Sequence, residues 1–349
     1  MILNALVLFI LFGFLFSNKK NTKIYVFFCV IFLVLIAGLR HESVGVDTHT
    51  YVWKYIDAKY MDYSEIWSNK EALYYSFQTF LSKQSFSPTF FLCAAALLFY
   101  PIVGIFIYKY SRIPAMSILL FLSMGYFYFS MTGMRQTLGL GFLLLSLIFI
   151  LKKQYIKGII YISIASLFHI TSLIYLIVIP ISFISQSKLK TYFVILISTM
   201  IVIVFFAGFL LFYFANLIWD DGRYTEINPQ GGFTTLLLLI AIAIFCYKCL
   251  KKEFFAQNQN NSDFQLLKIM LVGIPLQTLT IYAADAFRLA MLFHITSIIV
   301  LPNAVASIRD RNLKSICIFL IIILLLIEYY MFTSNGAGIQ PYHFFWEKV

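Results

Sequence analysis

Runs of apolar residues about as long as a bilayer is thick recur along almost the whole chain. A helix needs roughly 20 predominantly apolar residues to cross the hydrocarbon core, and about ten segments approach that length. They are residues 2–17, 24–39, 88–108, 114–131, 135–151, 191–215, 233–250, 266–284, 287–305 and 313–331. Only 12% of the residues are charged and 61% are hydrophobic, more apolar surface than a fold in water can bury. The sequence therefore predicts an all-α, polytopic membrane protein.

The apolar stretch between Lys157 and Lys188 is too short for two full crossings, yet long for one. If it crossed once, the acidic loop around Asp220–Glu226 would lie inside and the basic run Lys248–Lys252 outside. That arrangement opposes the positive-inside rule. A segment that enters and returns puts the basic loops inside. We therefore predict a broken, half-depth hairpin with its apex near Phe168-His169. Because Lys19, Lys20 and Lys23 follow the first apolar segment, we expect the N-terminus outside.

The chain reads as a single transmembrane domain, residues 1–349, with two loops on the outer face. The larger loop, residues 40–87, is rich in Tyr and Trp, which favour the membrane interface. We expect amphipathic helices there, lying at the interface. The second loop, residues 216–232, contains the breakers Pro229 and Gly231-Gly232.

Composition also excludes several classes of function. The net charge of +11 is spread over loops between apolar segments, so we expect no nucleic-acid binding. No group of His, Cys and carboxylate residues has a strong metal-ligand spacing, and no phosphate-binding loop occurs. We therefore expect no metal and no cofactor.

Four arginines stand on the predicted outer face, where topology disfavours them: Arg40, Arg135, Arg223 and Arg288. A guanidinium at membrane depth costs several kcal/mol unless it has a partner or water. Arg135 and Arg288 begin apolar helices, where backbone N–H groups also attract anions. Each arginine alone could reach lipid headgroups by snorkelling, but as a set they favour an anion-binding site.

Other polar residues on the same face could supply acid–base chemistry. His169 interrupts an apolar run, and an ionisable residue at membrane depth faces a cavity or a partner by default. Asp47, in the loop after Arg40, is a candidate base for a sugar hydroxyl, with Glu42 and Asp285 as rivals. Sequence alone leaves these three acids unranked.

Four motifs in order resemble the EpsG-type polysaccharide polymerases, a branch of the Wzy O-antigen and capsule polymerases. The first motif is Ala37-Gly38-Leu39-Arg40, followed by Val44-Gly45-Val46-Asp47 and Tyr51. The others are Met134-Arg135-Gln136, Phe168-His169 with Thr171-Ser172 after it, and Phe287-Arg288. Thr171-Ser172 replaces the commoner Ser-Ala pattern.

The resemblance implies a glycosyltransferase of the bacterial cytoplasmic (inner) membrane, with its active site facing the periplasm or exterior. Its donor and acceptor would be undecaprenyl-diphosphate-linked oligosaccharide repeat units, joined into O-antigen, capsule or exopolysaccharide. A chain-length regulator and a flippase would be further partners, beside the membrane lipids.

The residue chemistry suggests a role for each candidate in that reaction. Asp47, His169, Arg135 and Arg288 would be catalytic, with arginines neutralising the departing diphosphate. The substrate would be bound by Arg40, Glu42, Tyr51, Gln136, Arg223 and Asp285.

Two other functions remain open for such a chain. A transporter or flippase for the lipid-linked oligosaccharide would need a cationic path through both leaflets, and the basic residues within the apolar segments gather near one face. A ligase that transfers the glycan to another acceptor would use the same donor chemistry.

Overall fold

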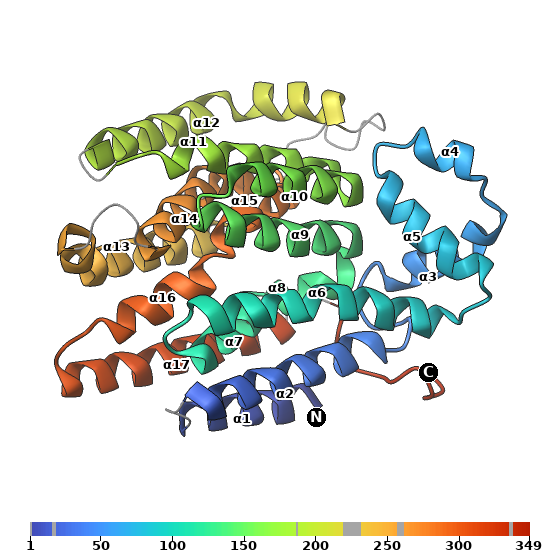
Figure 1. The fold of residues 1–349 in the computed structure, drawn as a ribbon, viewed down its shortest axis with the longest axis horizontal. Helices are drawn as coiled ribbons and strands as arrows, with labels where there is room; N and C mark the ends of the chain where they lie inside the picture. Colours follow the sequence, from blue (N-terminus) through green and yellow to red (C-terminus); the bar gives the residue numbers. More distant parts are fainter. Residues whose placement is uncertain (1, 16–18, 186–187, 219–231, 257–261, 335–337) are drawn as a thin grey trace. The chain divides into compact units, whose positions relative to one another are not determined.

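The computed structural model describes residues 2–15, 19–185, 188–218, 232–256, 262–334 and 338–349. Over these residues the protein is built from helices (Figure 1), and no named strand occurs. The α-helices are α1 Ile2–Phe12, α2 Lys19–Gly38, α3 Thr48–Asp57, α4 Tyr63–Trp67, α5 Ala72–Lys83, α6 Pro88–Tyr110, α7 Pro114–Ser123, α8 Tyr126–Thr132, α9 Met134–Leu151, α10 Tyr155–Phe168, α11 Val178–Ser182, α12 Leu189–Ile218, α13 Phe233–Ala256, α14 Ser262–Thr278, α15 Phe287–His294, α16 Ser297–Ala306 and α17 Arg311–Ser334.

Seven of the described helices are long and apolar enough to cross a membrane, or up to nine if two bent pairs each count as one span. The bent pairs are α7 with α8, bent by 51°, and α15 with α16, bent by 41°. The all-α polytopic fold is thus confirmed, and all nine lie within or close to predicted spans. The bend after α7 falls at Gly125, whose φ of +78° suits glycine.

The first predicted span, residues 2–17, differs from the structure. Its α-helix covers only Ile2–Phe12, and a 3-10 turn, Gly13–Leu15, follows. At 1.5 Å per residue this helix is shorter than the hydrocarbon core. Gly13 lies against the ring of Tyr25 from α2, where a Cβ would clash.

The predicted break at Phe168-His169 is confirmed. Helix α10 ends at Phe168, His169 is extended with φ −156° and ψ 117°, and a 3-10 segment, Ile170–Ile177, follows. The two apolar pieces on either side, Tyr155–Phe168 and Ile170–Ser182, are each too short to span alone. This is the pattern that a broken hairpin requires.

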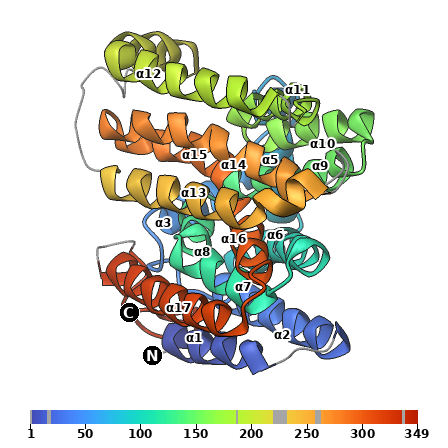
Figure 2. The ribbon, with the colours of Figure 1, turned by 90° about the vertical axis from the view of Figure 1, so that its left-hand side faces the viewer.

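The chain divides into two compact units, one made of Met1–Leu176 with Asp310–Val349, the other of Ile177–Arg309. In the first unit α9 packs against α6 and α10, and α2 packs against α6. Figure 1 shows α3, α4 and α5 gathered beyond the ends of α2, α6 and α9, so the residue 40–87 loop covers one end of these helices. In both views α17 lies close to α7 (Figure 2), which it contacts.

The helices of this loop bury one face and expose the other. In α3, Val52 and Tyr55 are buried, whereas Trp53 and Ile56 remain exposed. The apolar inner face packs on the membrane helices, because α3 contacts α6 and α5 contacts α10.

The second unit is arranged around α14, which contacts α11, α12, α13, α15 and α16. Two charged side chains of α14 are buried with partners. Asp263 accepts from Asn303 at 2.6 Å, and Lys268 donates to the carbonyls of Ile181 and Ile184 at 2.9 and 2.7 Å. Lys268 thereby ties the end of α11 to α14, since its ammonium satisfies carbonyls that the helix leaves open.

Candidate functional site

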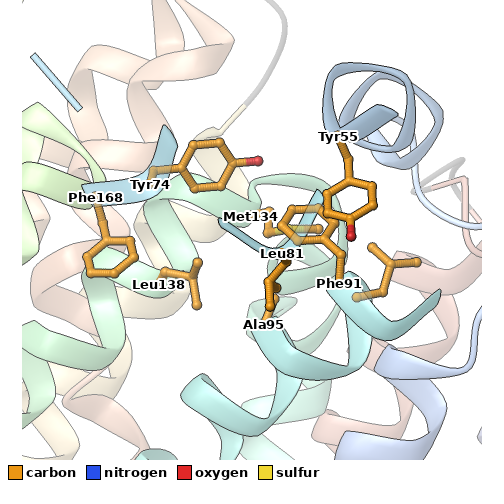
Figure 3. Close-up of a cluster of buried hydrophobic side chains, with 9 residues drawn as sticks. Tyr55, Tyr74, Leu81, Phe91, Ala95, Met134, Leu138 and Phe168 are labelled. Carbon is orange, nitrogen blue, oxygen red and sulfur yellow. The ribbon is translucent and has the colours of Figure 1, made fainter. Parts of the chain in front are cut away.

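An aromatic and aliphatic cluster anchors the residue 40–87 loop to the membrane helices (Figure 3). It joins Tyr55 of α3, Tyr74 and Leu81 of α5, Phe91, Leu92 and Ala95 of α6, Met134 and Leu138 of α9, and Phe168 of α10. Tyr55 stacks on Phe91 at 4.7 Å, and the Tyr55 hydroxyl donates to the Phe86 carbonyl. The start of α5 is therefore held against the ends of α9 and α10.

At that junction a buried carboxylate, Glu71, joins the two helices. Its Oε2 accepts from Arg135 Nη1 at 2.5 Å, and its Oε1 lies 2.6 Å from His169 Nδ1. The backbone N–H of Ile170 also donates to Oε1, at 3.4 Å. The Glu71 side chain is only 8% exposed, that of His169 15% and that of Arg135 36%. We call Glu71, Arg135 and His169 the charge cluster.

Local structure explains why each member of the charge cluster is available. Glu71 precedes α5 as its N-cap residue, but its side chain makes no capping hydrogen bond, so the carboxylate is directed at α9 and α10 instead. At the break after Phe168 the backbone of His169 leaves regular helix geometry. The N–H of Ile170 then donates a hydrogen bond to the Glu71 carboxylate. Arg135 is the second residue of α9.

The charges within the charge cluster decide its protonation. Burial alone would raise the pKa of Glu71, but the hydrogen bond from His169 and the charge of Arg135 outweigh it, so the pKa of this carboxyl lies below its ordinary value. Glu71 is therefore an anion at neutral pH. An ionised carboxylate only accepts hydrogen bonds, and the three donors around it match that state.

Hydroxyl groups surround the charge cluster. Tyr51 of α3 and Tyr75 of α5 interact electrostatically with Arg135. The Tyr74 hydroxyl and Ser172 Oγ are buried and have no hydrogen-bond partner among the described residues. Ser172 lies beside Gly139, where a Cβ would approach Ser172 Oγ to 2.9 Å and the Ala165 carbonyl to 3.2 Å. Gly139 thus allows α9 and α10 to approach closely beside His169.

Arg40 is buried elsewhere in the same unit, with only 3% of the residue exposed. Its guanidinium donates to the Ala37 and Met131 carbonyls and, at 3.4 Å, to Thr48 Oγ1. These acceptors lie near the ends of α2 and α8 and at the start of α3, so Arg40 joins three helices. Burial lowers its pKa to about 10, which leaves it charged at neutral pH.

A small cavity lies beside Arg40. Its lining includes Tyr100, Ser130 and Thr137, and its volume of about 10 Å³ is room for about one water molecule. A phosphate group is larger than this space. The contacts of Arg40 are therefore those of a tether between protein segments.

The C-terminal segment, residues 338–349, adds a second tie at Arg40. Phe344 pairs with Arg40 in an isolated antiparallel bridge, the His41 N–H donates to the His343 carbonyl, and the Phe345 N–H donates to the Leu39 carbonyl. The Tyr342 hydroxyl donates to the Ile36 carbonyl at 2.6 Å. The loop after α2 is therefore fixed from both sides.

The structure also places the other predicted site residues of the first unit. Asp47 is half-buried as the N-cap residue of α3 and makes no capping hydrogen bond through its side chain. Glu42 faces His49 at 4.0 Å in an exposed pair. Gln136 is buried.

In the second unit, Asp285 and Arg288 form an ion pair with each other at 3.3 Å, and both side chains are nearly half exposed. Arg223 lies outside the described residues, as does most of the predicted loop 216–232. Across the described residues no group of three or more His, Cys, Asp or Glu side chains could hold a metal ion.

Glu71 was missed by the sequence reasoning. It is one of several acids in a polar loop, and nothing in its immediate sequence separates it from Asp57, Asp62 or Glu65. One signal was present: Arg135 was predicted at the start of an apolar helix and His169 at the apex of the broken hairpin, and an ionisable residue at membrane depth calls for a partner.

Comparison with known proteins connects this architecture to a family. No curated protein and no solved structure matches the chain. The model of the EpsG family matches residues 23–344, nearly the whole chain, including the charge cluster. The protein therefore belongs to the EpsG family, the EpsG-type polysaccharide polymerases, as a multi-pass membrane protein with a polysaccharide polymerase or glycosyltransferase-like role.

Proposed function

We propose that this protein polymerises undecaprenyl-diphosphate-linked oligosaccharide repeat units into a surface polysaccharide, on the outer face of the bacterial cytoplasmic membrane. One lipid-linked glycan would be the donor, and a sugar hydroxyl of a second unit would be the acceptor. Family membership and the apolar helices support a polymerase in a membrane. The charge cluster carries the more specific proposal.

The supporting observation is that Arg135 and His169 meet at one buried carboxylate. They come from separate motifs, both of which carry the family resemblance. The bond to Glu71 uses Nη1 of Arg135, and a guanidinium has five N–H donors. Since over a third of the Arg135 side chain is exposed, its other donors are available to a diphosphate, which prefers the planar fork of arginine.

The direction of the helices supports an outer-face site. α9 and α10 are joined by a short turn near Lys152, Lys153 and Lys157, and the charge cluster lies at the opposite end of both helices. Basic turns favour the cytoplasm. The charge cluster and the residue 40–87 loop would then face the exterior, where lipid-linked repeat units are polymerised.

The proposed chemistry needs no nucleotide. The bond between the anomeric carbon and diphosphate already stores the driving energy, so the protein's main task is to stabilise charge on the departing diphosphate. Arg135 would do so directly. The other proposed contacts to sugar or diphosphate are Tyr51, Gln136, Glu42, Asp47, Asp285, Arg223 and Arg288. Arg40 we assign to positioning, because its donors hold protein acceptors.

The test is reconstitution of the purified protein in vesicles with synthetic undecaprenyl-diphosphate repeat units and no other protein. We expect a ladder of longer lipid-linked glycans. Arg135→Ala should abolish the ladder, and Arg135→Lys should restore it only in part, because a lysine cannot bind diphosphate through a planar fork.

A matched control is Lys54→Ala, which removes an exposed cation from α3 in the same loop. Intact substrate with no ladder from well-folded wild-type protein would refute the proposed polymerase. An undiminished ladder from Arg135→Ala would instead refute the assigned role of Arg135.

A further inference from the structure

The pairing of His169 with Glu71 determines which ring nitrogen can react. Nδ1 of His169 lies 2.6 Å from Oε1 of Glu71, and both side chains are largely buried. Glu71 also accepts from Arg135 and from the Ile170 N–H. A carboxylate with these donors is an acceptor only. Nδ1 must therefore carry the proton in the hydrogen bond to Glu71.

The opposite ring nitrogen then holds the lone pair. A neutral imidazole has one protonated and one unprotonated nitrogen, so a proton on Nδ1 leaves Nε2 as the basic atom. Nε2 makes no hydrogen bond to any residue that the structure describes, and the side chain keeps 15% exposure. His169 thus presents an unoccupied basic nitrogen from a ring that Glu71 holds in place.

We propose that His169, through Nε2, is the general base that activates the acceptor sugar hydroxyl, and that Glu71 is the positioning residue that fixes its tautomer. This inference rests on the proposed polymerase function. It replaces Asp47, Glu42 and Asp285 as the base.

The step balances as follows. Nε2 takes the proton of the acceptor hydroxyl, and the oxygen forms the new bond to the anomeric carbon of the donor. The bond from that carbon to the diphosphate oxygen breaks, and its electron pair leaves on the lipid diphosphate. The resulting imidazolium faces the Glu71 carboxylate, which stabilises the charge. Arg135, held by the same carboxylate, would neutralise the negative charge that grows on the diphosphate.

Neighbouring contacts support a fixed ring. The break at His169 places the ring outside regular helix geometry, and close packing at Gly139 holds the backbone of α10 near α9. The partly exposed Glu42–His49 pair has a looser separation of 4.0 Å. Only the buried pair couples a short hydrogen bond with a second donor, Arg135, on the same carboxylate.

The first test is Glu71→Gln, which keeps the size of the side chain and removes its charge. We expect kcat to fall by about 100-fold or more, as expected when a base loses its oriented tautomer, while KM changes little. Nitrogen NMR of the protein labelled with ¹⁵N-histidine should show His169 protonated at Nδ1 in the wild type. In Glu71→Gln that tautomer should lose its dominance.

The matched control is Glu347→Gln. It removes a carboxylate 2.9 Å from Nδ1 of His343, in an exposed pair of the same residue types. This change should leave kcat and the His169 signals unaltered. A purely structural role for Glu71 would lower the amount of folded protein without changing the His169 tautomer.

A second variant keeps the test decisive if Glu71→Gln does not fold. His169→Asn places an amide N–H where Nδ1 donates to Glu71 but has no atom at Nε2. We expect kcat to fall by about 10²–10⁴-fold. Wild-type kcat in either variant, or a lower kcat in Glu71→Gln with the His169 tautomer unchanged, would overturn the inference. The wild-type tautomer is measured without turnover, and a wild-type protein that makes no ladder would instead count against the polymerase itself.

Discussion

Arg135 and Arg288 are each the second residue of an apolar helix, yet their surroundings differ. The acid that pairs with Arg135 is 64 positions away in the chain and 8% exposed, and it also binds His169. The acid that pairs with Arg288 is three residues before it, and both of those side chains are nearly half exposed. The comparison shows that equal helix positions do not give equal chemistry. Tertiary packing around Glu71 removes water from one pair, while the other is a local surface pair.

The largest effect should come from Glu71→Ala. Removal of the carboxylate leaves Arg135 and His169 without their partner, and breaking a buried pair from one side costs about 3 kcal/mol or more. We expect loss of the glycan ladder by at least about 10³-fold, since both the positioning of the base and that of the arginine are affected. Ladder synthesis and thermal unfolding in detergent measure these changes. Glu65→Ala, at an exposed acid in α4, should alter neither, and equal losses in both variants would contradict the comparison.

Arg40→Ala should mainly reduce stability. Its guanidinium joins the ends of α2 and α8 to α3 through buried acceptors, and hydrogen bonds from charged groups contribute roughly 1.5–3 kcal/mol each. We expect a drop in Tm of several degrees, with residual activity per folded molecule. If activity disappeared at an unchanged Tm, Arg40 would be a substrate contact instead of a tether.

Gly139→Ala tests the close approach beside His169. The added methyl would press on Ser172 Oγ and the Ala165 carbonyl, and displacement of a catalytic group by about 1 Å can cost about 100-fold. We expect kcat to fall by about ten- to 100-fold with protein that still folds. The comparison variant is Gly273→Ala, where a Cβ would meet backbone atoms of Ala290 and His294 in the second unit at 3.1 Å. Equal kcat losses in the two variants would remove the special role of the α9–α10 contact.

The pH dependence of stability should report the ionised state of Glu71. Because the pKa of Glu71 is lowered on folding, its contribution is complete above the ordinary value of 4.5 and is lost as pH falls through the lower folded value. The difference in Tm between wild type and Glu71→Gln should stay constant from pH 8 to about pH 5 and shrink below about pH 4.5. A difference that grew as the pH fell would contradict the ionised state of Glu71.

The smallest effect should be that of Asp285→Asn. An exposed pair contributes about 0–1 kcal/mol, so Tm should change by less than the error of most unfolding measurements in detergent. A large drop in Tm would show that the Asp285–Arg288 pair supports the second unit more than its exposure indicates.

Much of the fold could be predicted from hydropathy alone. The predicted spans coincide with the described membrane helices because lipid forces backbone hydrogen bonds to close within each helix, which leaves length and apolarity as the deciding quantities. The break at His169 could be predicted as well. The apolar stretch between Lys157 and Lys188 is too short for two crossings, and a single crossing would put basic residues outside. The short α1 and the bend at Gly125 depended on local contacts and backbone angles that hydropathy does not record.

Arg135 and His169 could be identified from the sequence, because an ionisable residue at membrane depth is costly and stands out within an apolar segment. Glu71 could not, because it lies among other acids in a polar loop and acquires its importance only by burial. The tertiary structure also decided the contrast between Arg40 and Arg135: both are arginines at helix ends, but one is directed at protein acceptors and the other at a partly open cluster. The sequence determines which charged residues need a partner within the membrane. Only packing decides which partner they find, because the free energy of a charge depends on the water and the groups that the fold leaves around it.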